Sequence, residues 1–167
     1  QNREDEIKER IQSSMSFIMF MGIGFIFGLA GTAKTFIPLF FGPGYDKAIL
    51  LLQAMSPLVA IVGVSSCIGA QYYTPAGLRK KSAQYIIVGS VVNLCFNILL
   101  IPMLSSFGAV IGSIVAESVV SFLYLKNCKY YKFIDLFNNS WKKIISGFIM
   151  ACVIVLIGRF LVGGFVC

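Results

Sequence analysis

Five long apolar stretches constrain the fold of this chain more than any other feature. They cover residues 15–41, 48–70, 85–104, 109–125 and 144–166. A helix rises about 1.5 Å per residue, so about 20 apolar residues carry it across the hydrocarbon core of a bilayer. The stretches are too long, and alternate too little, to be the strands of a membrane β-barrel. The sequence therefore predicts an all-α membrane protein with about five transmembrane helices.

The low charge content indicates the same environment. Charged residues make up 13% of the 167 residues, and hydrophobic residues make up 57%. Soluble domains carry about 25% charged residues. This chain therefore has too few polar side chains to cover a water-soluble globule of its size.

Turn-forming residues separate the stretches. Residues 42–44 close the first, residues 74–77 close the second, and residues 105–108 link the third to the fourth. The last link is so short that the helices it joins should form an antiparallel hairpin. We expect a cytoplasmic tail at 1–12, a four-helix membrane part at 13–125, a cytoplasmic loop at 126–143 and a fifth transmembrane helix at 144–167. The chain opens on a polar segment without Met or a signal peptide, so we also expect a longer parent protein.

The distribution of Lys and Arg predicts the orientation, because the cytoplasmic loops of membrane proteins carry an excess of both. With the N-terminus in the cytoplasm, eleven of the fourteen basic residues lie on the cytoplasmic side. These are Arg3, Lys8, Arg10, Arg79, Lys80, Lys81, Lys126, Lys129, Lys132, Lys142 and Lys143. Lys34, Lys47 and Arg159 lie on the other side. Membrane topology thereby explains the net charge of +7, and no nucleic-acid partner is expected.

The sequence carries no signature of an enzyme. It contains no His, the side chain that most often serves as a general base or metal ligand. It also lacks a Ser/His/Asp set, a metal-binding cluster, a Walker loop and a glycine-rich dinucleotide motif. The five Cys residues are scattered without C-x-x-C spacing, and we interpret them as small hydrophobic residues. We therefore expect no catalysis, no metal and no cofactor.

Polar side chains recur at helical spacing within two of the apolar stretches. The fourth stretch contains Ser113, Glu117 and Ser121, and the third contains Ser90, Asn93 and Asn97. Each set lies on one face of its helix, and polar groups within a bilayer usually face a bundle interior or a wet cavity. Glu117 is either a carboxylate that lines a cavity or binds a proton, or a neutral side chain bonded to a neighbouring helix. The Asn residues either line the same cavity or join two helices.

Two basic sites also have two interpretations. Lys34 lies late in the first stretch. Its side chain either extends to the outer surface of the bilayer or points inward and holds an anion such as pyrophosphate. Arg79, Lys80 and Lys81 follow the second stretch. They either serve topology alone or contact anionic lipid head groups.

Four motifs in residues 10–127 resemble, in order, those of a known family. Residues 40–45 (FFGPGY) followed by Ala48 resemble an F-G-x-x-Y-x-x-A signature. Residues 69–77 (GAQYYTPAG), with the basic residues at 79–81, resemble the inner end of the following helix. Residues 93–102 and 108–117 are similar to N-x-x-x-N-x-x-L-I-P and G-A-x-x-x-(S/T)-x-x-x-E elements. The family is that of flippases for O-antigen and capsule repeat units, within the superfamily of multidrug, oligosaccharidyl-lipid and polysaccharide exporters.

The resemblance implies a two-lobed helical transporter with alternating access in a bacterial plasma membrane. Its substrate would be an undecaprenyl-pyrophosphate-linked oligosaccharide, moved to the outer leaflet for the synthesis of surface polysaccharide. This chain would supply part of the C-terminal lobe, with the bilayer and an N-terminal lobe of the same protein as its partners. The substrate cavity would include Lys34, Asn93, Asn97 and Glu117, and head-group contacts would come from Arg79, Lys80 and Lys81.

Two other classes remain open at this point. One is a multidrug or lipid II exporter of the same superfamily, and a multidrug antiporter would use Glu117 to couple transport to an ion gradient. The other is a membrane scaffold that transports nothing. Its intramembrane polar residues would serve packing alone.

Overall fold

The computed structural model describes residues 2–132, 134–135, 141–142, 144–149 and 153. Its elements are helix α1 (Asn2–Phe41), helix α2 (Asp46–Ile68), a π-helical turn η1 (Gly69–Tyr73), helix α3 (Arg79–Leu104) and helix α4 (Ser106–Lys126). No strand occurs among these described residues. All four α-helices are long and apolar enough to cross a membrane. The chain is therefore an all-α, multi-pass membrane protein, as the apolar stretches predicted.

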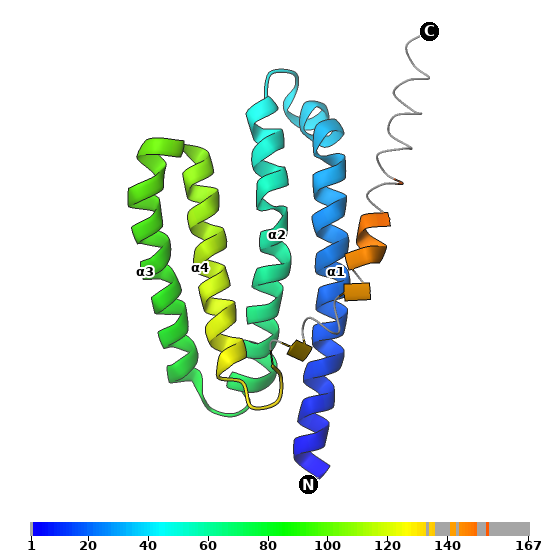
Figure 1. Ribbon diagram of the computed structural model, residues 1–167, viewed down its shortest axis with the longest axis vertical. Coiled ribbons are helices and arrows are strands. Elements are labelled where there is room, and N and C mark those ends of the chain that lie inside the picture. Colours follow the sequence, from blue (N-terminus) through cyan, green and yellow to red (C-terminus); the bar gives the residue numbers. More distant parts are fainter. Residues whose placement is uncertain (1, 133, 136–140, 143, 150–152, 154–167) are drawn as a thin grey trace.

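The helices form two antiparallel pairs that lie side by side (Figure 1). Helix α1 packs along α2, helix α3 packs along α4, and the pairs are joined where α2 contacts α4. Helix α4 consequently lies between α2 and α3 (Figure 1). The expected hairpin of the third and fourth helices is present as the α3–α4 pair.

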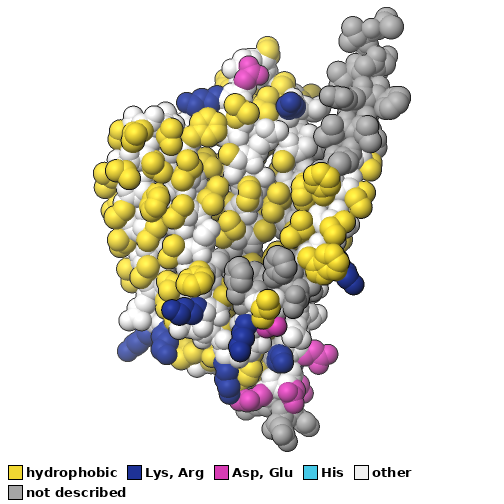
Figure 2. All heavy atoms as spheres, viewed as in Figure 1, with side chains coloured by type: hydrophobic (Ala, Val, Ile, Leu, Met, Phe, Trp, Pro, Cys, Tyr) yellow, Lys and Arg dark blue, Asp and Glu magenta, His cyan; other side chains and the backbone are white. Residues whose placement is uncertain are grey.

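One end of the structure carries most of the positive charge (Figure 2). The N-terminus, the turn between η1 and α3 and the last turn of α4 all lie there (Figure 1). We call it the basic end, after the basic residues at the start of α3, at the end of α4 and just after α4. These are Arg79, Lys80, Lys81, Lys126, Lys129 and Lys132. The opposite end holds the α1–α2 turn and the α3–α4 turn.

Apolar side chains cover the outside of the helices (Figure 2). Leu39 of α1 is 78% exposed and Ile98 of α3 is 68% exposed. In α3, which is described over its whole length, only Gly89 is buried. Such apolar surfaces suit contact with lipid, because hydrocarbon cannot hydrogen-bond to exposed polar groups.

Two separate apolar clusters hold α1 against its neighbours. In the cluster nearer the basic end, α1 supplies Ile11, Met15, Met19 and Ile23, which repeat every four residues and form one stripe of the helix. The partners of this stripe come from α2, η1, α4 and the residues after α4. The cluster nearer the other end is smaller and consists of Ala33, Ile37 and Ile49.

The helices extend beyond the stretches that hydropathy marked. The residues expected as a tail at 1–12 are helical from Asn2 onward and continue into α1. Helix α3 begins at Arg79, before its apolar stretch, and the link to α4 is the single residue Ser105. Hydropathy marks the part of a helix that suits lipid, and these helices continue past it.

The expected fifth helix falls mostly on residues that lie outside the described part of the chain, Arg159 among them. Residues 144–149 are described, and they are helical. They lie beside α1, where the rings of Phe27 and Phe148 meet edge to face with their centroids 6.4 Å apart. The loop expected at 126–143 is described only at 126–132, 134–135 and 141–142.

Candidate functional site

A groove of about 810 Å³ lies between α2, α3 and α4. Helix α4 forms its floor, because this helix lies between the other two. The polar residues that line the groove are Ser65, Ser66, Thr74, Ser90, Asn93, Ser113, Glu117 and Tyr124. We call it the polar groove. It begins at Thr74, close to the basic end, and reaches Leu58 and Asn93 near the middle of α2 and α3.

A short chain of hydrogen bonds fixes one side of the polar groove. Asn97 Nδ2 donates to Asn93 Oδ1 at 2.8 Å, and Asn93 Nδ2 donates to Ser113 Oγ at 3.4 Å. The chain therefore connects α3 to α4. Asn97 Oδ1 is buried against α4, where a Cβ on Gly112 would lie 2.6 Å from it. Only glycine at position 112 leaves room for this amide.

Glu117 lies one helical turn after Ser113 on the floor of the groove and is half-buried. Among the described residues, none donates a hydrogen bond to its carboxylate or forms an ion pair with it. No Lys or Arg is among the described residues that line the groove. The carboxylate is therefore available to accept hydrogen bonds from a ligand, or to take up a proton or a cation.

Tyr124 and the π-helical turn η1 line the end of the groove that is nearer the basic end, and other aromatic rings pack behind them. Tyr73, in η1, meets the rings of Tyr72, Tyr85 and Tyr124 edge to face, with centroids 4.9 to 5.7 Å apart. The hydroxyl groups of Tyr124 and Ser82 lie 2.5 Å apart, which joins the ends of α4 and α3. Single π-helical turns inside α-helices often mark functional sites, and η1 supplies part of this end of the groove.

The structure brings together some of the residues that the sequence singled out, but not all of them. Asn93 and Glu117 line the same groove, with Ser90 and Ser113 beside them. Asn97 lies beyond the groove and supports Asn93 through its amide. Ser121 is buried, and its hydroxyl donates to the carbonyl of Ile61 in α2 at 2.8 Å. This bond joins the two helix pairs.

Lys34 is not brought to the polar groove. Its side chain is exposed on α1, and no residue of α1 is among the described residues that line the groove. Lys34 precedes the end of α1 at Phe41 by seven residues, or about 10 Å along the axis. The groove that contains Asn93 and Glu117 therefore does not include Lys34, and a role of its ammonium group in a substrate cavity stays a prediction.

The basic residues that begin α3 are exposed. Among the described residues, none forms an ion pair with Arg79, Lys80 or Lys81. Positive side chains in the first turn of a helix are disfavoured by the positive end of the helix dipole. An anion from outside the chain would relieve this repulsion.

Some groove residues were missed by sequence reasoning. Ser65 and Ser66 of α2, Thr74 after η1 and Tyr124 of α4 line the groove, and none of them was singled out. The pair of Ser residues within an apolar stretch was the available signal. Nothing in the sequence shows that α2 forms the wall of the groove opposite α3, because the order of helices depends on tertiary packing.

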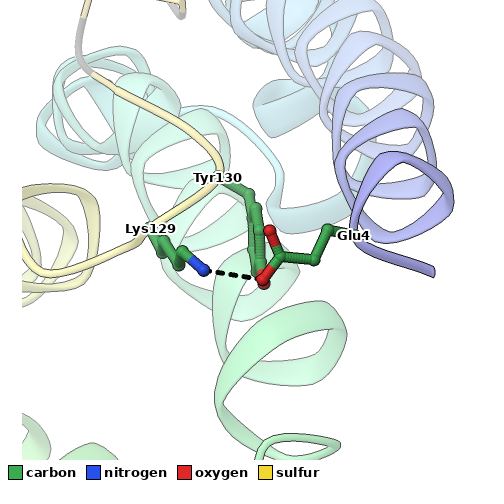
Figure 3. A network of polar contacts seen from close by, with 3 residues as sticks. All are labelled: Glu4, Lys129 and Tyr130. Carbon is green, nitrogen blue, oxygen red and sulfur yellow. Dashed lines mark hydrogen bonds and ion pairs between the residues drawn. The ribbon is translucent and has the colours of Figure 1, made fainter. Parts of the chain in front are cut away.

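A second polar contact lies outside the groove at the basic end. Glu4 Oε1 accepts hydrogen bonds from Lys129 Nζ at 2.7 Å and from the Tyr130 hydroxyl at 3.1 Å (Figure 3). The hydrogen bond to Glu4 raises the pKa of Lys129 above its ordinary value. The contact ties the start of α1 to the segment that follows α4, although both charged side chains are largely exposed.

Comparison with known proteins gives one significant similarity. No family model matches the chain, and no solved structure matches it. Over 115 residues, or 69% of this chain, the sequence is 26% identical to a protein of Escherichia coli (strain K12) named "Putative O-antigen transporter". The matched segment covers 28% of that protein's length. The chain is thus similar to a part of that protein and not to the whole of it.

Proposed function

We propose that this chain is part of the C-terminal lobe of a transporter that flips lipid-linked oligosaccharides across the bacterial plasma membrane. The polar groove carries the proposal, because it offers amide, hydroxyl and carboxylate groups within a layer of membrane-spanning helices. The similarity to a protein named as an O-antigen transporter supports the same class. The proposed substrate is an undecaprenyl-pyrophosphate-linked repeat unit used in surface polysaccharide synthesis.

The chemistry of such a substrate matches two surfaces of the chain. Its sugars carry hydroxyl groups that need hydrogen-bond partners wherever water is excluded. The groove supplies these partners through Asn93, Ser113 and Glu117. Its lipid tail needs only hydrocarbon, and the outside of the helices is apolar. The head group can therefore move along the protein while the tail stays in the bilayer.

Two further parts of the proposal concern what surrounds the groove. An N-terminal lobe of the same protein would complete the cavity from the other side. Arg79, Lys80 and Lys81 would contact phosphate groups where the substrate enters, which would neutralise the repulsion at the start of α3. We leave Lys34 out of the cavity. Its distance from the groove and its place near the end of α1 favour a lysine that extends to the bilayer surface.

The proposal places the basic end in the cytoplasm. A Cys introduced at Gln84 should then be shielded from an impermeant thiol reagent applied outside the cell, and a Cys introduced at Ser105 should be labelled. Native Cys residues must first be replaced, above all the exposed Cys95. Cys128 interferes less, because burial raises the pKa of its thiol. Labelling at Gln84 and protection at Ser105 would reverse the orientation.

An ion-coupled exporter is the second candidate function. The carboxylate of Glu117, which has no partner in the described part of the chain, favours it, because exporters that exchange ions use carboxylates within the membrane. A dependence of substrate release on an ion gradient, lost in Glu117→Gln, would support this candidate. A scaffold without transport activity would show no effect of Asn93, Ser113 or Glu117 on any transported compound.

The decisive experiment measures surface polysaccharide and protein abundance together, in cells that produce the complete transporter. Asn93→Ala and Glu117→Gln should lower surface polysaccharide strongly while the protein remains in the membrane. Ser118→Ala is the matched control, because Ser118 is exposed on α4 next to Glu117 and, among the described residues, bonds only to the carbonyl of Ile114. Normal surface polysaccharide in both Asn93→Ala and Glu117→Gln would show that these residues serve packing alone and would contradict the proposal.

A further inference from the structure

We infer that the polar groove receives the sugar part of the glycolipid and leaves its phosphate at the basic end, and that Glu117 selects against acidic sugars. This inference rests on the proposed function in one respect, namely that the ligand is a glycolipid. It adds the chemical class of sugar that the groove accepts. It also assigns the two charged parts of such a ligand to different places on the chain.

The lining of the groove carries the first step. Its polar groups include the hydroxyl groups of Ser66, Ser90 and Ser113, the amide of Asn93 and the carboxylate of Glu117. Sugar hydroxyl groups both donate and accept hydrogen bonds, so these groups can pair with them. The Glu117 carboxylate is acceptor-only when ionised, and it has no partner among the described residues. The Glu117 carboxylate therefore favours a ligand that donates hydrogen bonds to it.

Charge carries the second step. Glu117 is the only carboxylate, and no Lys or Arg is present, among the described residues that line the groove. A uronic acid or a phosphate in the groove would place a second negative charge beside Glu117, where the surrounding helices weaken solvent screening. A neutral sugar meets no such repulsion, and the ammonium group of an amino sugar is attracted.

The position of the basic residues carries the third step. The groove begins at Thr74, five residues before Arg79, so the cationic start of α3 lies just past this end of the groove. Along α3, Arg79 and Asn93 are fourteen residues apart, or about 21 Å. One ligand can therefore hold its phosphate against Arg79, Lys80 and Lys81 while its sugars extend toward Asn93 and Ser113. The phosphate of the ligand then lies at the start of α3, outside the groove that contains the Glu117 carboxylate.

The test uses the methyl glycosides of glucose, glucosamine and glucuronic acid as probes. Binding to the chain in phospholipid nanodiscs is measured by saturation-transfer NMR over a range of probe concentrations. We expect the glucoside and the glucosaminide to bind at least about tenfold more tightly than the glucuronide. Glu117→Gln should bring the glucuronide within about twofold of the glucoside. Glu117→Asp keeps the charge and should keep the discrimination.

Asp46→Asn is the matched control, because it removes a carboxylate at the start of α2, outside the groove. It should leave the tenfold ratio unchanged. Equal binding of the glucuronide by the unmodified chain, an unchanged ratio in Glu117→Gln, or no binding of any probe would each overturn the inference. The proposed transport function is judged separately by surface polysaccharide, so either idea can fail while the other stands.

Discussion

The α1–α2 pair and the α3–α4 pair associate by different means. Apolar side chains hold α1 and α2 together in two clusters, one toward each end of the pair, and a hydrogen bond of 2.9 Å from Gln53 Nε2 to the Ala30 carbonyl also joins them. The α3–α4 pair relies on close backbone approach, with Gly89 facing Val120 and Gly108 facing the carbonyl of Leu100, and on the amides of Asn93 and Asn97. Lipid replaces apolar contacts readily, but it cannot replace close packing or a hydrogen bond. The α3–α4 pair therefore depends more on a particular glycine, because a Cβ at Gly108 would lie 2.8 Å from a backbone nitrogen of α3, whereas a Cβ at Gly22 of α1 would lie 3.1 Å from the backbone of Ala60 in α2.

The turns of the two pairs differ as well. Between α1 and α2, the residues with positive φ are Gly42 (83°) and Gly44 (98°). Between α3 and α4, the single linking residue is Ser105, with a φ of 54° and a ψ of −129°. Glycine adopts such values at no steric penalty, whereas a residue with a Cβ is strained there. The α3–α4 pair therefore has a tight turn held by contacts on both sides of it.

The largest effect should come from adding one methyl group between α3 and α4. In Gly108→Ala the new Cβ would lie 2.8 Å from the backbone nitrogen of Ile101 and closer still to the Leu100 carbonyl. Backbone atoms of a helix cannot move aside as a side chain can, so we expect a loss of about 1–3 kcal/mol of stability. The measurement is the unfolding midpoint in detergent micelles.

Gly24→Ala is the control for this change, because no atom lies within 4 Å of the added Cβ on α1. Its stability should stay the same or rise slightly, since Ala favours helix more than Gly does. Gly63→Ala should be milder than Gly108→Ala, because the nearest atom is the end of the Ile18 side chain. Similar losses for Gly24→Ala and Gly108→Ala would refute the idea that backbone proximity distinguishes the α3–α4 pair.

The next effect should be a gain. Ser105→Gly removes the Cβ from the one described non-glycine residue with a positive φ, and we expect about 1 kcal/mol of stabilisation. The extra freedom of glycine in the unfolded chain offsets part of the relief. Ser106→Gly serves as the comparison, because Ser106 is already in α4 and should not gain. A loss of stability in both variants would show that the Ser105 turn is unstrained.

The sequence predicted the helices well because hydropathy reports directly on which segments suit lipid. The second stretch began within two residues of α2, and the third and fourth ended within one residue of α3 and α4. The starts of α1 and α3 could not be predicted in this way. The first helical turns of α1 and α3 are polar, and hydropathy does not distinguish a polar helical turn from a polar tail.

The candidate site was predicted in part. Helical spacing shows which residues share a face, and it correctly grouped Ser90 with Asn93 and Ser113 with Glu117. Spacing says nothing of which helices are neighbours. Lys34 is therefore not among the residues that line this groove, and Asn97 faces Gly112 instead of the groove.

A smaller effect should arise where the two pairs meet. The Ser121 hydroxyl in α4 donates to the Ile61 carbonyl in α2, so Ser121→Ala should remove about 0.6–1.7 kcal/mol of stability. Ser118→Ala removes a hydroxyl that bonds only within α4, and it should change little. Both are measured by the same unfolding midpoint. If the two variants behaved alike, the α2–α4 contact would depend on apolar packing alone.

The smallest effect should come from the ion pair at the basic end. Lys129 and Glu4 are both largely exposed, so water and salt screen their attraction, and exposed pairs of this kind contribute little to stability. Lys129→Ala should therefore match the control Lys126→Ala, which changes an exposed lysine that the structure leaves without a partner among the described residues.

The hydrogen bond to Glu4 raises the pKa of Lys129. Its contribution is thus fully present below the ordinary pKa of lysine, about 10.4, and is lost only as pH rises through the raised value. Unfolding midpoints compared between pH 6 and 9, at low and at high salt, should show no difference between the two variants. A selective loss in Lys129→Ala that disappears in high salt would instead show that this contact stabilises the packing of α1 against the segment after α4.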